Sequence, residues 1–127
     1  MIRHAIRRKA KVLVVEDSFL LAGDLCEFLR SCGYEPVGPA HRVDEAAKLL
    51  KDHRIDAAIL DIMLGGRPCF PLCDHLERWN VPFLFLTGSD ITGIPSTHRH
   101  VPLLSKPFDR ALLKRTLDGL LALPAAA

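Results

Sequence analysis

The chain has 127 residues, a formal net charge of +2, 49% hydrophobic residues and 25% charged residues, which is typical of one globular domain. This composition excludes a disordered chain, and the small net charge argues against nucleic acid as a partner. The sequence has neither a signal peptide nor the roughly 18 consecutive apolar residues of a membrane span, so we expect a cytoplasmic protein that acts without a membrane.

Basic residues concentrate near the N-terminus, at Arg3, Arg7, Arg8, Lys9 and Lys11. We interpret residues 1–10 as a loose basic leader, with electrostatic contact to an acidic partner or a membrane surface as the alternative. Residues 11–123 are the predicted domain, and residues 124–127 are predicted to be a flexible tail. We expect no effector domain after the predicted domain.

The first half of the chain alternates between strand and helix patterns. Residues 11–16 contain the continuous apolar run VLVV, which indicates a parallel strand buried on both faces. A helix is predicted from Ser18, with Gly33 as its C-terminal stop. Residues 34–40 contain two prolines and are predicted as a short edge strand. Residues 43–53 predict a helix with its acids early and its basic residues late.

The second half continues the alternation. Residues 55–61 and 81–87 predict two buried strands, separated by a glycine- and proline-rich loop over 62–71 and a short helix over 72–79. Residues 88–100 show little helical periodicity, which indicates a loop or a much reduced helix. Residues 101–107 predict a last strand, and four leucines mark a closing amphipathic helix: Leu113, Leu117, Leu120 and Leu121.

This alternation predicts an α/β fold, a doubly wound parallel sheet with helices on both faces. Ligands bind such sheets beyond the carboxyl ends of the strands. Five polar residues lie at or just past the ends of four predicted strands, and we expect them to converge there: Glu16, Asp17, Asp61, Thr87 and Lys106.

Three carboxylates in one crevice repel each other, by about 4 kcal/mol for each pair near 4 Å at an effective dielectric of about 20. Either protons or a cation must compensate, and an all-oxygen set favours Mg²⁺, which shares its remaining positions with water and phosphate oxygens. Lys106 adds a positive charge suited to a phosphoryl group and Thr87 adds a hydroxyl donor. The chemistry indicated is phosphoryl transfer.

Four stretches, VLVVEDS, AAILDIML, LFLTG and LSKPF, resemble the signatures of the receiver domain of two-component response regulators, the CheY-like family. They occur in the family's order over nearly the whole chain. The resemblance implies a flavodoxin-like sheet of five strands in the order 2-1-3-4-5, with the fourth helix short or irregular here.

The resemblance also implies roles for the site residues. Asp61 would take a phosphoryl group from the phosphohistidine of a histidine kinase. Asp17 and Asp61 would ligate Mg²⁺, with Glu16 acting mainly through water and the backbone carbonyl of Met63 completing the protein ligands.

Two further residues would respond to phosphorylation in such a domain. Lys106 would pair with the phosphoryl oxygens, followed by a cis peptide bond to Pro107, and Thr87 would hydrogen-bond the phosphoryl group. The nearby switch position, usually an aromatic residue, is Leu103, so an aromatic rotamer switch is not expected. Together with the reduced segment 88–100, this departure predicts a remodelled output surface.

The stretches VGPA, LGGRPCFP and FLTGSD resemble stand-alone receivers of alphaproteobacteria, several of which connect to histidine kinases of the HWE type. We therefore expect a histidine kinase or a phosphotransfer protein as partner, and a monomer or a weak phosphorylation-dependent dimer. The output is left open between phosphorylation-dependent protein binding, a phosphate relay and a phosphate sink. Such a domain catalyses only its own phosphorylation and dephosphorylation, without turning over a separate substrate.

Two other readings compete. A phosphorylation-independent pseudo-receiver would be a protein-binding module with a damaged site, whereas here all the site residues are present. A haloacid-dehalogenase-type phosphohydrolase requires an acid two residues after its aspartate nucleophile, where this chain has Met63.

The remaining candidate residues have ordinary structural interpretations. The four cysteines show no zinc-type spacing and are expected to be reduced fillers, with a redox role for Cys69 and Cys73 as the alternative. The six histidines are expected at the surface, and His98 and His100 have partner recognition as an alternative role. Trp79 and Phe83 are expected to pack in the core.

Overall fold

The computed structural model describes residues 8–88 and 93–122, so most of the predicted leader and the predicted tail lie outside the described residues. Its main sheet has five parallel strands in the order β2-β1-β3-β6-β7, which confirms the predicted order of the five sheet strands. The strands are β1 Lys11–Val15, β2 Glu35–Ala40, β3 Ala57–Leu60, β6 Phe83–Thr87 and β7 Leu103–Ser105.

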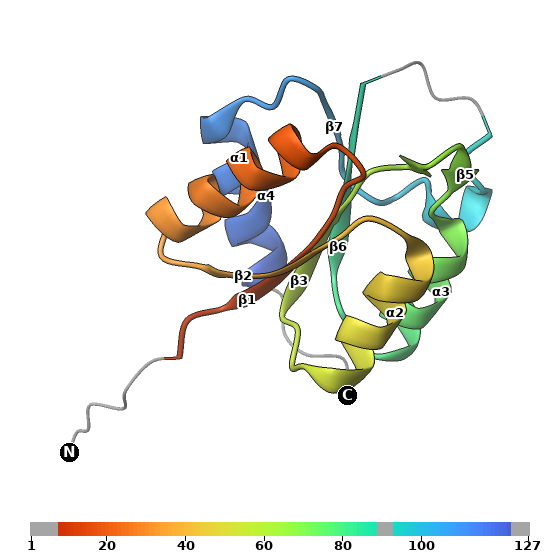
Figure 1. Ribbon diagram of the computed structural model, residues 1–127, viewed down its shortest axis with the longest axis horizontal. Helices are drawn as coiled ribbons and strands as arrows, with labels where there is room; N and C mark the ends of the chain where they lie inside the picture. Colours follow the sequence, from red (N-terminus) through yellow and green to blue (C-terminus); the bar gives the residue numbers. More distant parts are fainter. Residues whose placement is uncertain (1–7, 89–92, 123–127) are drawn as a thin grey trace.

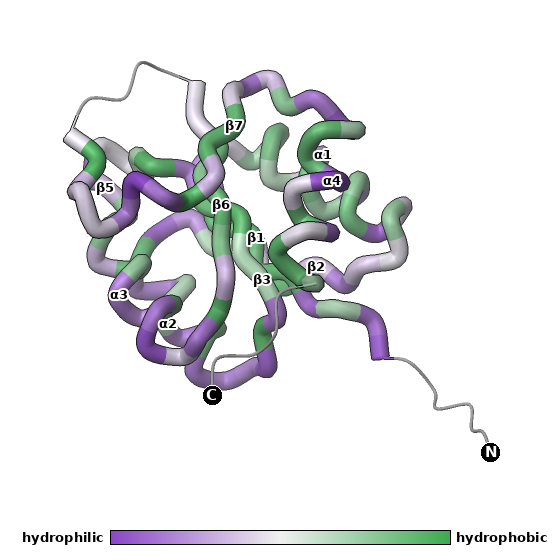
Figure 2. Tube along the Cα trace, turned by 180° about the vertical axis from the view of Figure 1, so that it is seen from behind, coloured by the Kyte–Doolittle hydropathy of each residue, from purple (hydrophilic) through white to green (hydrophobic). Residues whose placement is uncertain are grey.

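Four α-helices in the described residues cover the two faces of the sheet (Figure 1). Helices α1, Phe19–Ser31, and α4, Arg110–Leu121, lie on one face, and α2, Val43–Asp52, and α3, Phe70–Arg78, lie on the other. Figure 2 shows the apolar strands at the centre, with the more hydrophilic stretches toward the outside. Within the described residues, no helix combines the length and the apolar content needed to cross a bilayer.

The continuous apolar strands are explained by two separate cores. Along β1, Val12 and Val14 pack with α1 and α4, whereas Leu13 and Val15 pack in the core beneath α2 and α3. Successive side chains of a strand point to opposite faces, so a strand covered on both sides needs apolar residues at every position. Polar chemistry is therefore confined to the strand ends.

Helix ends agree with the sequence signals. The Ser18 side chain caps α1 by accepting the Leu21 N–H at 3.3 Å, and Asp109 caps α4 by accepting the Leu112 N–H at 2.9 Å. Gly33, with φ of +88°, follows the end of α1 as predicted. The Ser18 cap fixes the chain direction directly after the acids that end β1.

The connections on either side of α3 and β6 differ from prediction in one place and agree with it in another. Residues 62–71 were predicted as a loop, but they contain a two-stranded antiparallel hairpin of β4, Met63–Leu64, and β5, Arg67–Pro68, and helix α3 begins at Phe70. In the described part of segment 88–100 the helical structure is one 3-10 turn, η1, Ser96–His98. This confirms a reduced fourth helix for the described residues, and residues 89–92 lie outside them.

Two aromatic predictions were wrong. Trp79 is 56% exposed, because α3 ends at Arg78 and the chain turns at Asn80, whose φ is +57°. His98 was expected at the surface, but it is only 4% exposed, because η1 folds its ring against Phe70 and Phe83. The prediction that Phe83 packs in the core is confirmed.

The cysteines have the properties of buried thiols. None of the four forms a disulfide; Cys26, Cys69 and Cys73 are buried and Cys32 is half-buried. The hydrogen bond with Cys69 and burial both raise the pKa of Cys73, and burial raises the pKa of Cys26. A raised thiol pKa disfavours the reactive thiolate of Cys73, and Cys69 is buried, which together argue against the redox alternative for this pair.

A pair of glycine substitutions tests the packing of the edge strand. Gly38 in β2 has φ of +98°, and an added Cβ would lie 2.8 Å from the backbone nitrogen of Ala40. We expect Gly38→Ala to lower the free energy of unfolding by at least about 2 kcal/mol, measured by urea denaturation. Gly23→Ala is the control: this helical position has no neighbour within 4 Å of an added Cβ, so the change should stabilise by about 0.5–1 kcal/mol. Equal losses in both variants would contradict this explanation.

Candidate functional site

The predicted polar residues converge at the carboxyl edge of the sheet. Glu16 and Asp17 follow β1, Asp61 follows β3, Thr87 ends β6 and Lys106 follows β7. The pairing register brings these ends together, since Val15 pairs with Leu60 and Thr87 pairs with Ser105. Lys106 is anchored there by its N–H, which donates to the Thr87 carbonyl at 2.7 Å. The Lys106–Pro107 bond is cis, as expected.

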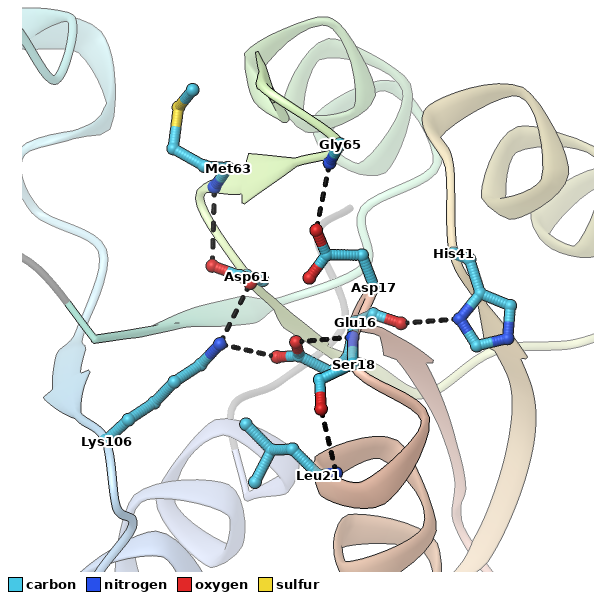
Figure 3. A network of polar contacts seen from close by, with 9 residues as sticks. All are labelled: Glu16, Asp17, Ser18, Leu21, His41, Asp61, Met63, Gly65 and Lys106. Atoms are coloured by element: carbon cyan, nitrogen blue, oxygen red, sulfur yellow. Dashed lines mark hydrogen bonds and ion pairs between the residues drawn. The ribbon is translucent and has the colours of Figure 1, made fainter.

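Lys106 connects the two buried acids of the site. Its ammonium Nζ lies 2.8 Å from Oε1 of Glu16 and 2.9 Å from Oδ2 of Asp61 (Figure 3). Glu16 is 1% exposed and Asp61 is 7% exposed, whereas Asp17 is exposed. Buried carboxylates need a partner charge or hydrogen bonds, and Lys106 supplies a charge to both acids and a hydrogen bond to Asp61.

The environment shifts the pKa values of the adjacent acids Glu16 and Asp17 in opposite directions. Burial raises the pKa of Glu16, although hydrogen bonds from Lys106 and the Ser18 N–H oppose it. The Gly65 N–H, 3.0 Å from Oδ2 of Asp17, lowers the pKa of that carboxyl. Burial acts to lower the pKa of Lys106, but its hydrogen bonds and ion pairs with Glu16 and Asp61 outweigh burial and raise it.

The small hairpin contributes backbone donors to the site. The Met63 N–H donates to Oδ1 of Asp61 at 3.3 Å, and the Gly65 N–H donates to Asp17 (Figure 3). Sequence reasoning missed this hairpin, because its glycines and prolines indicated only a loop. Gly65, with φ of +57°, lies in the turn that brings these N–H groups to the acids.

His41 is a residue beside the site that sequence reasoning also missed. Its Nδ1 lies 2.8 Å from the Glu16 carbonyl oxygen (Figure 3). The centroid of its ring lies 4.7 Å from that of Phe19. The His41 N–H donates to Glu45 at 3.1 Å, so the start of α2 is linked to the end of β1. No spacing in the sequence relates His41 to the strand-end acids.

The site has the composition of a pocket for a hard cation. Oxygens of Glu16, Asp17 and Asp61 lie within 4.8 Å of one another. With all three ionised, three carboxylates and one lysine carry a formal charge of −2, which one divalent cation balances. Oxygen donors of this kind suit Mg²⁺, and the exposed Asp17 side leaves room for water and phosphate oxygens.

Comparison with known proteins gives the family. The family described as "Response regulator receiver domain" matches residues 12–118 of this chain. The chain is a response regulator receiver domain. Such domains act in phosphorylation-based signalling, they interact with histidine kinases or phosphotransfer proteins, and they generally bind Mg²⁺ at an acidic pocket.

Individual relatives agree with this assignment. The receiver is 42% identical over 102 residues to the transcriptional regulatory protein PdtaR of Mycobacterium tuberculosis, covering 77% of this chain and 50% of that protein. It spans about half the length of the curated relatives it matches.

Two solved structures have closely similar lengths. The solution structure of SdrG from Sphingomonas melonis Fr1 has a TM-score of 0.79 and 36% identity, and the match covers 90% of this receiver and 98% of that chain. The BeF3-activated conformation of SdrG, from Pseudomonas melonis Fr1, has a TM-score of 0.76 and 36% identity, with 88% and 96% covered.

The electrostatic role of Lys106 can be measured through stability. Lys106→Met removes the counter-charge of two buried acids, so in EDTA the free energy of unfolding should fall by about 1.5–3 kcal/mol, and Mg²⁺ should restore part of it. Lys114→Met is the control, since Lys114 forms an exposed pair with Asp118 and should change stability by no more than about 0.5 kcal/mol. Urea denaturation with and without Mg²⁺ gives both values. An equal loss in the two variants would contradict the role assigned to Lys106.

Proposed function

We propose that this receiver accepts a phosphoryl group on Asp61 from the phosphohistidine of a histidine kinase, in a Mg²⁺-dependent reaction. A carboxylate oxygen of Asp61 attacks phosphorus, the P–N bond breaks, and its electron pair returns to the imidazole of the donor. The position of Lys106 carries the proposal. Its Nζ lies 2.9 Å from Asp61, so it is placed to pair with the phosphoryl oxygens after the Asp61 carboxylate has formed its bond to phosphorus.

The acids and the hairpin supply the ligands of the cation. Asp17 and Asp61 are the proposed direct carboxylate ligands, Glu16 acts mainly through water, and the Met63 backbone carbonyl completes the protein ligands. Bound Mg²⁺ neutralises charge that develops on the phosphoryl oxygens. The low pKa of Asp17 supports its role, because the carboxyl stays ionised and available to a cation.

Thr87 is the proposed reporter of phosphorylation. It is buried at the end of β6, and its carbonyl accepts the Lys106 N–H, so Thr87 lies beside the residue that would pair with the phosphoryl group. Hydrogen bonding of Thr87 to the phosphoryl group would be read at the neighbouring surface. Leu103 lies on that surface and is 47% exposed, so it replaces the family's aromatic switch with a side chain that already lies partly in solvent.

The match to the receiver-domain family supports a signalling role in which the chain does not turn over a separate substrate. We infer a cytoplasmic receiver whose partner is a histidine kinase, of the HWE type on its sequence motifs, or a phosphotransfer protein. Its output is phosphorylation-dependent binding, relay or sink, as a monomer or a weak dimer. The activated conformation described for SdrG supports an activated state for this receiver as well, whereas a pseudo-receiver would lack one.

Substitution of the acceptor tests the central proposal. Asp61→Asn should abolish phosphorylation by acetyl phosphate while keeping the fold, because the amide is a poor nucleophile of nearly the same shape. Intact mass spectrometry should show a Mg²⁺-dependent gain of one phosphoryl group in the wild type. Asp24→Asn, at an exposed position of α1, is the matched control and should be phosphorylated normally. Stoichiometric phosphorylation of Asp61→Asn would refute the assignment, and a wild type silent toward both acetyl phosphate and its kinase would favour the pseudo-receiver.

Leu103 offers a test of the output surface. We expect Leu103→Ala to leave phosphorylation and partner binding within about twofold of the wild type, since the side chain is half-exposed and no aromatic ring has to reorient. A selective loss of partner binding in Leu103→Ala, with normal phosphorylation and stability, would show that this leucine is part of the switch.

The role of Lys106 in the response has its own test. Lys106→Ala should still accept phosphate, more slowly, but lose the amide chemical-shift changes of activation.

A further inference from the structure

A second group of metal-binding side chains lies away from the phosphorylation site. Asp74 and Glu77 are spaced three residues apart on α3, so they share one face of the helix. His98 faces them from η1, which lies beside α3 (Figure 1). One ligand atom from each of the three side chains lies within 4.8 Å of the others.

His98 is held rigidly in this group. Its ring is 4% exposed, stacks on Phe70 at a centroid distance of 6.2 Å, and meets Phe83 edge-on at 6.4 Å. Its Nδ1 lies 3.3 Å from Oε2 of Glu77 and its Nε2 lies 3.9 Å from Oδ1 of Asp74. The aromatic contacts fix the ring plane, so the ring lies next to the two carboxylates before any ligand binds.

The hydrogen bonding of His98 is incomplete. Among the described residues, the buried Nδ1 has no hydrogen-bond partner, since the nearby Glu77 oxygen does not meet hydrogen-bond geometry. In a neutral imidazole one of the two nitrogens carries a lone pair, and each nitrogen has a carboxylate oxygen within 3.9 Å, so one lone pair lies close to a negative charge, which is repulsive. Either a second proton on the ring or a cation shared between ring and carboxylates removes that repulsion.

We propose that Asp74, Glu77 and His98 form a site for a divalent transition metal of the zinc class. One imidazole nitrogen with two carboxylates suits Zn²⁺ better than Mg²⁺, which prefers oxygen ligands alone. Zinc bonds of about 2.0–2.2 Å place neighbouring ligand atoms about 3.4 Å apart in a tetrahedron, close to the 3.3 Å between Nδ1 and Glu77. Asp74 and Glu77 are exposed, so the metal can enter from solvent and keep a water as fourth ligand.

The metal would connect two elements that are separate in the chain. His98 belongs to the segment between β6 and β7, and the carboxylates belong to α3, so an ion bound to all three fixes η1 against the helix. This inference does not rest on the proposed phosphorylation of Asp61, because none of its three ligands belongs to that site.

The test is a Zn²⁺ titration of the full chain against a chromogenic chelator, in excess Mg²⁺ so that the acidic pocket is occupied. We expect the Asp74→Asn, Glu77→Gln double variant to bind Zn²⁺ at least about tenfold more weakly than the wild type. The double variant Asp24→Asn, Glu27→Gln is the matched control, with the same charge change at the same three-residue spacing on α1, and should bind like the wild type.

Imidazole ¹⁵N chemical shifts identify the ligand directly. On addition of one equivalent of Zn²⁺, a ring nitrogen of His98 should move to the range of a metal-bound imidazole in the wild type and stay unchanged in the Asp74, Glu77 variant. Because both carboxylates are exposed, this variant should fold even if His98→Gln does not. Equal Zn²⁺ affinity in the wild type and the Asp74, Glu77 variant, or a His98 ring doubly protonated and unaffected by Zn²⁺, would overturn the proposal in favour of a protonated ion pair.

Discussion

The ion pairs of Lys106 with Glu16 and Asp61 are the interaction on which the rest of the site depends. Glu16 is almost completely buried, and a buried carboxylate without a partner charge would either become protonated or destabilise the fold. The Lys106 ammonium prevents this, since its Nζ lies 2.8 Å from Glu16 and 2.9 Å from Asp61. A single positive charge on Lys106, however, does not balance three carboxylates. With all three acids ionised, the site therefore keeps a residual negative charge beside the exposed Asp17, and this charge favours a cation there.

The parallel sheet explains why this charge gathers at one place. Its central strands are apolar at every position, because helices cover both faces, and so the chain changes to polar residues only where a strand ends. Parallel pairing then brings the carboxyl ends of β1, β3, β6 and β7 to one edge. The Ser18 cap and the Gly65 turn aim the adjacent acids differently: Glu16 lies inward toward Lys106, and Asp17 lies outward toward the hairpin.

This arrangement also explains how much the sequence predicted. Apolar runs predicted the other strands of the sheet, and two prolines predicted β2 as an edge strand. The ends of four strands then indicated the site residues, because strand ends are visible in a sequence: Glu16, Asp17, Asp61, Thr87 and Lys106. The hairpin donors, His41 and His98 were missed for a different reason. Each acts through a contact between segments that no local spacing records, such as His41 with the Glu16 carbonyl. Trp79 was misplaced because the end of α3 and the turn at Asn80, not hydrophobicity, decide where its side chain lies.

The described part of the connection between β6 and β7 contains a short helical turn, η1, that is held by side-chain contacts. Where a regular helix would hold itself through its own backbone hydrogen bonds, η1 has only three residues. Its position is fixed instead by the His98 ring, which is buried between Phe70 and Phe83 and faces two carboxylates of α3. Thr87 precedes His98 in the chain, and His98 is packed against α3. In the sheet, Thr87 pairs with β7, which carries the exposed Leu103. If Thr87 responds to phosphorylation as proposed, the response passes to β7 and Leu103, because Thr87 pairs with Ser105 in that strand.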